Sequence, residues 1–176
     1  MTTFIDKAPM GMVIVDIDGT LSNHSKRYQK YFFDGDLEAF HSAYAEDKPT
    51  KHAQHIFRYL ECTAENDMIF YVSLRYEKHM AGTIEWMAKH ISRKFEHYRN
   101  GGPILKKTFI MGTKPGGENA VQARIRQVKE CYQIRAAEAL RLGLDHGPAV
   151  IFDDDSSNAN AIARKFPNAA IFVPHK

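Results

Sequence analysis

Five short apolar runs, separated by longer segments of helical periodicity, limit the folds that this sequence can adopt. The runs cover residues 12–18, 67–74, 107–111, 149–154 and 169–173. Because consecutive positions within them are apolar, both faces of each strand must be covered, as in a parallel sheet between two layers of helices. The alternation predicts an α/β fold, Rossmann-like, with a mainly parallel sheet and helices on both of its faces.

The segments between the runs have apolar residues at three- and four-residue steps, which is typical of amphipathic helices. We expect helices over 51–62, 78–95, 118–142 and 156–166. In the third of these, Val121, Ile125 and Val128 share one stripe, and Gly143 is a helix stop signal. The polar and aromatic stretch 22–50 is too long for a turn, and we expect it to form a small flap or minimal cap near the strand ends. It is called the flap below.

Length and composition are those of an ordinary globular protein. The 176 residues, 44% of them hydrophobic and 26% charged, predict a single domain over 1–176. No apolar run approaches the ~20 residues of a membrane span, so we expect no membrane association. Cys62 and Cys131 show no metal-ligand spacing, and two free buried thiols in a reducing cytoplasm is the expected arrangement.

Positive charge is concentrated in one part of the chain. The overall net charge is +3, but residues 89–141 contain twelve Lys or Arg and only four Glu. Two interpretations remain open for this segment. It suits an anionic substrate larger than a bare phosphate, or it consists of solvated helix faces that happen to be basic.

Carboxylates follow two of the apolar runs. The first ends in Asp16 and Asp18, and the fourth ends in Asp153 and Asp154. Residues i and i+2 of a strand point the same way, and ligands of parallel sheets lie at the carboxyl ends of the strands. Four carboxylates gathered there repel one another unless a hard cation neutralises them, and Mg²⁺ is the ion that such oxygen ligands favour. A calcium-binding EF-hand loop does not fit, because the twelfth position counted from Asp16 is Arg27. Asp155, after the strand, is a candidate cap for the helix that follows.

Three further residues have the chemistry to act on a phosphoryl group. Ser73 ends the second run and Arg75 follows it, so a hydroxyl and a guanidinium are available at that strand end. Lys129 in the third helix is the preferred cation beside the carboxylates. Other interpretations stay open, since Ser73 is also a plausible helix cap and Lys106, Lys107 and Lys114 compete with Lys129.

The order DIDGTL at 16–21, Ser73 after an apolar strand, a helical lysine and IFDDD at 151–155 resembles the four-motif pattern of the haloacid dehalogenase (HAD) superfamily. The resemblance implies that Asp16 is a nucleophile that takes the phosphoryl group, and that Asp18 is a general acid and base. It also implies that Ser73 and Lys129 hold the transferring oxygens, and that Asp16, Asp18, Asp153 and Asp154 bind Mg²⁺. The candidates for substrate binding are Gly19, Thr20, Arg75 and Lys114.

Within that superfamily the chain resembles the phosphatase domain of bacteriophage-type polynucleotide kinase 3′-phosphatases. The similar stretches are DGDLEAFHSAYAEDKP at 34–49, VSLRYEKHMAGTIEWMAKH at 72–90 and RQVKECY at 126–132. Two features depart from the family: Leu74 stands where the second motif usually has Gly, and the loop 112–126 lacks the usual acidic stretch. No GxxxxGK[ST] motif occurs, so the kinase part is missing.

The resemblance implies a cytoplasmic, Mg²⁺-dependent phosphatase acting on nucleic-acid 3′-phosphate ends or nucleotides. A separate kinase or ligase acting on the same ends is the expected partner. Three alternatives stay open: a small-molecule phosphatase of the same superfamily, a receiver-like signalling module, and a non-catalytic nucleic-acid-binding domain. The motif order disfavours the receiver, and the intact carboxylates disfavour plain nucleic-acid binding because they repel a phosphate backbone.

Overall fold

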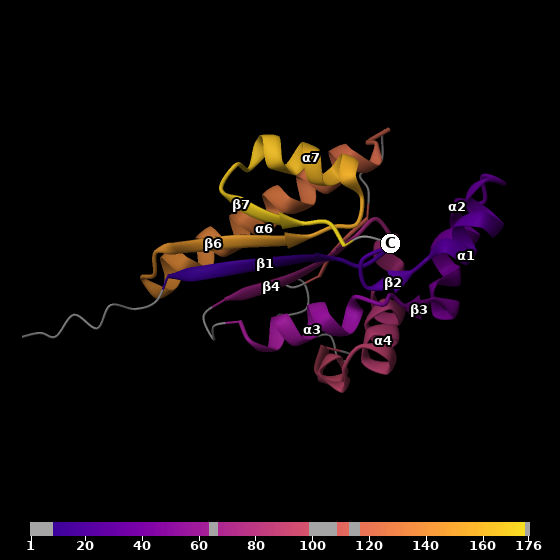
Figure 1. The fold of residues 1–176 in the computed structure, drawn as a ribbon, viewed down its shortest axis with the longest axis horizontal. Helices are drawn as coiled ribbons and strands as arrows, with labels where there is room; N and C mark the ends of the chain where they lie inside the picture. The colour runs from indigo at the N-terminus through magenta and orange to yellow at the C-terminus, as the bar shows by residue number, and fades with distance from the viewer. Residues whose placement is uncertain (1–8, 64–66, 99–108, 113–116, 175–176) are drawn as a thin grey trace, which may run out of the picture.

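The computed structural model describes residues 9–63, 67–98, 109–112 and 117–174. In this part of the chain, five strands form one sheet in the order β5-β4-β1-β6-β7, and every neighbouring pair is parallel (Figure 1). The strands are β1 (Met10–Asp16), β4 (Met68–Ser73), β5 (Phe109–Met111), β6 (His146–Phe152) and β7 (Ala169–Phe172). The predicted α/β class with a mainly parallel sheet is confirmed. The first predicted strand is displaced by two residues toward the C-terminus, because β1 begins at Met10 and ends at Asp16 rather than running from 12 to 18.

The four predicted helices are present, with shifted ends. They are α3 (Ala53–Glu61), α4 (Met80–His90), α6 (Ala120–Leu142) and α7 (Ser156–Lys165). The second is shorter than predicted, because 3₁₀ turns at Glu77–His79 and Arg93–Tyr98 flank it. Asn119 and Gln122 form a reciprocal capping box that starts α6. Gly143, with a φ of 65°, ends it as the sequence predicted.

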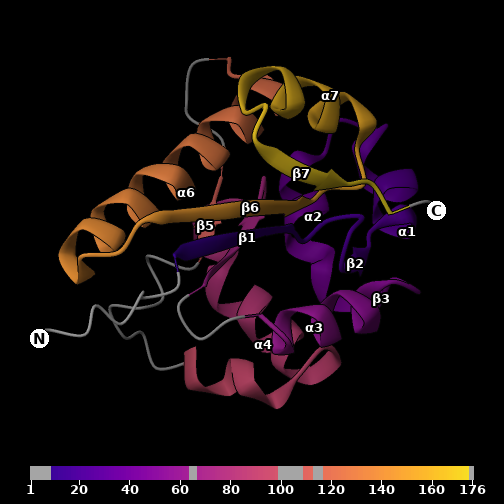
Figure 2. The same ribbon diagram turned by 60° about the vertical axis from the view of Figure 1, so that its left-hand side comes forward.

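Helices cover both faces of the sheet (Figures 1 and 2). Successive side chains of a strand point to opposite faces, so β1 contributes to two separate apolar cores. Val15 packs with Ile84 of α4 in one of them. Ile14 packs with Val128 of α6 and Ile162 of α7 in the other. The central strand is therefore fully enclosed, and its carboxyl end is fixed in position on both sides.

The flap consists of short elements beyond the carboxyl ends of the strands (Figure 1). They are β2 (Ser22–Asn23), α1 (Ser25–Arg27), a π-helical turn (Tyr28–Phe32), α2 (Leu37–Ser42), a 3₁₀ turn (Ala43–Glu46) and β3 (Lys48–Pro49). The antiparallel pairing of β2 with β3 closes its base. Trp86 of α4 donates from Nε1 to the main-chain oxygen of Asp47 at 2.8 Å, which attaches the flap to the helical layer.

Two smaller expectations are also resolved. Both cysteines are free, but only Cys131 is buried, and Cys62 is exposed instead of buried as expected. Among the described residues, no helix combines the length and the apolar character that crossing a bilayer requires.

Candidate active site

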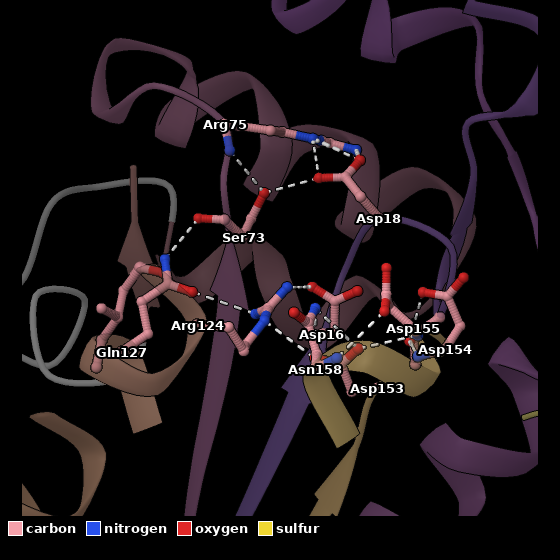
Figure 3. A network of polar contacts seen from close by, with 12 residues as sticks. Asp16, Asp18, Ser73, Arg75, Arg124, Gln127, Asp153, Asp154, Asp155 and Asn158 are labelled. Atoms are coloured by element: carbon pink, nitrogen blue, oxygen red, sulfur yellow. Dashed lines mark hydrogen bonds and ion pairs between the residues drawn. The ribbon is translucent and has the colours of Figure 1, made fainter. Parts of the chain in front are cut away.

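Functional side chains from three adjacent strands meet at one edge of the sheet (Figure 3). Asp16 is the last residue of β1 and Ser73 the last of β4, whereas Asp153 directly follows β6. Because β4, β1 and β6 are neighbours and parallel, their carboxyl ends place these side chains together. All three residues are buried, with exposed fractions of 2% or less.

A cluster of three carboxylates forms the centre of the site. Asp16, Asp153 and Asp154 each offer an oxygen within 4.8 Å of the others. Burial raises the pKa of Asp16 well above its usual range; a nearby guanidinium lowers it only in part, and repulsion from Asp153 adds to the rise. Burial likewise raises the pKa of Asp153. The raised pKa values mean that ionising these two carboxyl groups is costly in the metal-free protein, and a bound cation would lower that cost.

Arg124, in the first turns of α6, is the cation of this cluster. Its Nη2 donates to Asp16, and its Nε lies 3.0 Å from Oδ2 of Asp153. The sequence prediction that Lys129 fills this place is wrong, because Lys129 lies on the exposed side of the helix five positions further on. The signal that was missed is the position of Arg124 on the buried stripe of α6 that also contains Val128 and Cys131.

The donor set fits a divalent cation. Asp16, Asp153 and Asp154 place three carboxylates beside the Arg124 guanidinium, and a divalent cation would add further positive charge to the same group. All candidate ligands are carboxylate oxygens, as that ion prefers. Two hydrogen bonds support the arrangement: the backbone amide of Asp155 donates to Asp153 Oδ1 at 3.0 Å, and the side-chain Nδ2 of Asn158 donates to the same oxygen at 3.3 Å.

Asp18 does not join the cluster. Arg75 binds the Asp18 carboxylate through two contacts, with Nε 3.0 Å from Oδ2 and Nη2 2.7 Å from Oδ1. Ser73 Oγ donates to Oδ2 of the same carboxylate at 2.7 Å. Arg27 of the flap donates to Oδ1 as well. Burial favours a higher pKa for Asp18, but Arg75 and Arg27 outweigh it and hold the pKa far below its usual range. Asp16 and Asp18 do line the same cavity, as expected, but Asp18 is not part of the three-carboxylate cluster, because the strand ends before it.

Arg27 and Asp47 are members of this network that the sequence did not reveal. The Nε of Arg27 lies 2.9 Å from Oδ2 of Asp47, and Nη2 of Arg75 lies 3.5 Å from the same oxygen. Two guanidinium groups and two carboxylates thus balance one another. The Arg75 guanidinium is also 4.9 Å from the ring centre of Tyr44. Arg27 ends the three-residue helix α1 and Asp47 lies between the 3₁₀ turn and β3, and elements this short have no periodic pattern that would mark either residue.

Gly19 and Thr20, predicted to bind substrate, support Asp154 instead. Thr20 Oγ1 accepts a hydrogen bond from the Asp154 amide at 3.0 Å, and the Thr20 residue is fully buried. Gly19 has a φ of 97°, and a Cβ there would collide with the Asp154 carboxylate. Neither residue lines the cavity described next. Lys114, the remaining candidate, lies outside the described residues, as do Lys106 and Lys107.

A cavity of about 630 Å³ opens above the carboxylates. Its floor contains Asp16, Asp18 and Arg124, and Leu74, at the unusual motif position, lines it too. The flap supplies the opposite wall, formed by His24, Ser25, Tyr28, Gln29, Phe32, Phe40 and His41. The site therefore has a charged side and an aromatic side, and a bound molecule would contact both.

Two further predictions from the sequence concern Asp155 and the basic segment 89–141. Asp155 is the N-cap of α7, as predicted, and accepts from the amides of Ser157 and Asn158 at 2.7 and 3.2 Å. The described basic residues of the segment 89–141 are of two kinds: Lys89, Arg93 and Lys129 are exposed, whereas others are buried or paired with an acid. Arg124 and Arg135 are buried, Arg126 pairs with Glu118, and Arg141 pairs with Glu138.

Comparison with known proteins gives structural neighbours only. No protein-family model matches the sequence, and no similar curated protein is found. Among solved structures, the HAD domain of effector protein Lem4 from Legionella pneumophila is similar, with 14% identity and a TM-score of 0.45 over 95% of this chain and 86% of that one. An inactive mutant of the same domain gives 13% identity and a TM-score of 0.45 over 96% of this chain and 86% of that one. The activity of the present chain has to be inferred from its own site.

Proposed function

We propose that this protein is a Mg²⁺-dependent phosphatase that acts through an aspartyl-phosphate on Asp16. The observation that carries the proposal is the carboxylate cluster of Asp16, Asp153 and Asp154, whose oxygens lie within 4.8 Å of one another at the ends of two parallel strands. A cluster of three carboxylates beside a cavity, two of them buried, fits a site that binds a cation and, through it, an anionic group.

In the proposed reaction, a carboxylate oxygen of Asp16 attacks phosphorus, and the bond from phosphorus to the leaving oxygen breaks. When bound by Asp16, Asp153 and Asp154, Mg²⁺ supplies positive charge to the phosphoryl oxygens. Arg124 keeps Asp16 in place and offsets charge beside it. The Arg75 guanidinium is the donor on the β4 side of the cavity, and Ser73 Oγ, which does not line the cavity, donates to Asp18.

Asp18 is proposed to move the protons. In this structure it is ionised and held by Arg75 and Arg27. Phosphoryl oxygens that attract these two guanidinium groups would weaken their hold, so that Asp18 gains a proton and donates it to the leaving oxygen. The resulting carboxylate then accepts a proton from the water that attacks phosphorus. That attack breaks the bond between phosphorus and Asp16 and releases phosphate, and Asp18 then returns its proton to solvent as Arg75 and Arg27 bind its carboxylate again.

Nucleic-acid 3′-phosphate ends or nucleotides are the proposed substrates. The aromatic wall of the cavity supports a substrate that is larger and flatter than a sugar phosphate. A second hollow of about 320 Å³ on the flap also contains Lys26, Lys30 and Lys48, which suits a nearby phosphate backbone.

Phosphate release tests the proposal. A 3′-phosphorylated oligonucleotide, nucleoside 3′- and 5′-monophosphates and an aliphatic sugar phosphate are compared with Mg²⁺ and with EDTA. We expect turnover of the oligonucleotide and of one or both nucleoside monophosphates, and we expect EDTA to abolish that turnover. Turnover of the sugar phosphate alone would refute the nucleotide part of the proposal, and activity that is unaffected by EDTA would refute the metal.

Two variants test whether activity depends on the proposed nucleophile or is equally sensitive to an aspartate outside the site. Asp16→Asn, which removes the nucleophile with little change in shape, is expected to lower kcat by at least about 1,000-fold. Asp34→Asn, an exposed aspartate of the flap, is the matched control and is expected to keep wild-type activity. Equal losses in the two variants would contradict the assignment of Asp16.

A further inference from the structure

Three aromatic rings of the flap are packed into a rigid group on the cavity wall. Tyr28 and Phe32 stack with centroids 4.4 Å apart and an interplanar angle of 14°. Phe40 meets the edge of this pair, 5.5 Å from Phe32 and 6.1 Å from Tyr28. The Arg27 guanidinium lies over the ring of Phe40, 4.5 Å from the ring centre. The rings are thus oriented before any ligand arrives, which lowers the entropy cost of binding.

The wall remains partly open. All three rings line the cavity, and Phe32 keeps 40% of its surface exposed. Phe33, its neighbour in sequence, is 74% exposed but does not line the cavity. An apolar surface that faces a cavity with a charged floor gains free energy when a flat ring covers it.

Two imidazole groups border the same wall. His24 and His41 line the cavity, and the Nδ1 atom of each is buried without a hydrogen-bond partner among the described residues. Burial lowers the pKa of both side chains, that of His41 to about 4, so each is neutral at physiological pH. A neutral imidazole has one donor and one acceptor, which can pair with the polar edge of a base.

These features together select a class of ligand. A sugar offers a puckered C–H face but not the flat aromatic surface of a base, and a lipid chain has no polar edge for the imidazoles. A nucleobase has both, and a phosphate attached through a sugar can lie on the carboxylate side of the same cavity.

We propose that the wall formed by Tyr28, Phe32 and Phe40, together with His24 and His41, is a nucleobase subsite that binds the terminal base of the substrate. The proposal rests on the proposed function, since it places the scissile phosphate at Asp16. Under this proposal, the substrate is a nucleotide or a nucleic-acid end with an intact base. Phe32 then has a role in binding, and Phe33 has none.

The test compares two oligonucleotides with a 3′-phosphate, one ending in a normal nucleotide and the other in an abasic residue. For the wild type we expect kcat/KM to be about 10-fold higher with the base than without it. Phe32→Ala should reduce this ratio to near one by lowering only the rate with the base. Phe32→Tyr, which keeps a stacking ring, and Phe33→Ala should both retain the wild-type ratio. A wild-type ratio near one, or an equal loss on both oligonucleotides in Phe32→Ala, would overturn the subsite.

Binding gives a measurement that does not depend on turnover. In the Asp16→Asn background, calorimetry with a nucleoside 3′-monophosphate and Mg²⁺ should give a Kd about 10-fold weaker after Phe32→Ala and unchanged after Phe33→Ala. If no phosphomonoester is hydrolysed but this difference is found, the proposed function fails and the subsite stands. If hydrolysis occurs but Phe32→Ala leaves Kd unchanged, the subsite fails and the proposed function stands.

Discussion

Arg124 contacts both Asp16 and Asp153, donating to the first and placing its Nε 3.0 Å from Oδ2 of the second. The three residues come from α6 and from the ends of β1 and β6. One fixed guanidinium thus links the proposed nucleophile to a proposed metal ligand. It neutralises only part of their charge and leaves the remainder for a divalent cation.

Arg124→Gln should destabilise the protein mainly when metal is absent. Removing one partner of a buried ion pair costs about 3–5 kcal/mol, and at this chain length that lowers Tm by roughly 10 °C in EDTA. Mg²⁺ should recover a large part of the loss, because it neutralises the same carboxylates. Thermal unfolding with and without Mg²⁺ measures both effects. Lys129→Gln, on the exposed side of the same helix, is the control, and a larger effect there than at Arg124 would restore the sequence prediction.

Gly19→Ala should disturb Asp154 directly. The substitution costs about 1–2 kcal/mol from the positive φ, and the new Cβ also collides with the Asp154 carboxylate. Gly35→Ala is the matched control, because Gly35 has a φ of 75° and open space around it. We expect both variants to lose stability in chemical unfolding and only Gly19→Ala to bind Mg²⁺ more weakly. Equal Mg²⁺ affinity in the two variants would argue against Asp154 as a ligand.

The stabilisation by Mg²⁺ should increase with pH. The pKa values of Asp16 and Asp153 are raised in the folded state, mainly by burial, so their contribution to stability is fully present below the unfolded value of about 4 and is lost as pH rises through the folded pKa. Mg²⁺ binds the ionised carboxylates and should reverse that loss. The difference in Tm between Mg²⁺ and EDTA is therefore expected to be small at about pH 5 and larger at about pH 7.5. A difference that is independent of pH, or that is retained in Asp153→Asn, would contradict metal binding at this cluster.

His41 should make the protein less stable in acid. Burial lowers its pKa to about 4, below the unfolded value of about 6.5, so the unfolded chain binds the extra proton between these values. The contribution of neutral His41 to the free energy of unfolding is fully present above about pH 6.5 and is lost as pH decreases toward about 4. His41→Gln should flatten this part of the curve of Tm against pH, whereas His55→Gln, at an exposed position on α3, should leave the curve unchanged.

The sequence predicted the strands of the sheet and the acids that follow them because both depend on local patterns. Continuous apolar runs identified the strands, and the acids that follow them identified Asp16 and Asp153. The cap at Asp155 followed from its position before a helical pattern. These features needed no knowledge of distant contacts.

The rest of the site depends on contacts between distant residues. Arg124 and Asp16 are 108 positions apart, and which cation of α6 faces the strands depends on the exact rotation of that helix. Arg27 and Asp47 pair across short flap segments, where no periodicity fixes the direction of a side chain. The separation of Asp18 from Asp16 depends on β1 ending at Asp16, and strand ends are the least predictable part of a sequence pattern.

Covalent labelling of the protein tests the central claim most directly. The wild type is mixed with Mg²⁺ and an oligonucleotide carrying a radiolabelled 3′-phosphate, and the reaction is stopped in acid within milliseconds. We predict transient label on the protein that is lost as phosphate is released, no label on Asp16→Asn, and undiminished label on Asp34→Asn. Label on Asp16→Asn, or phosphate release by that variant at the wild-type rate, would contradict the account.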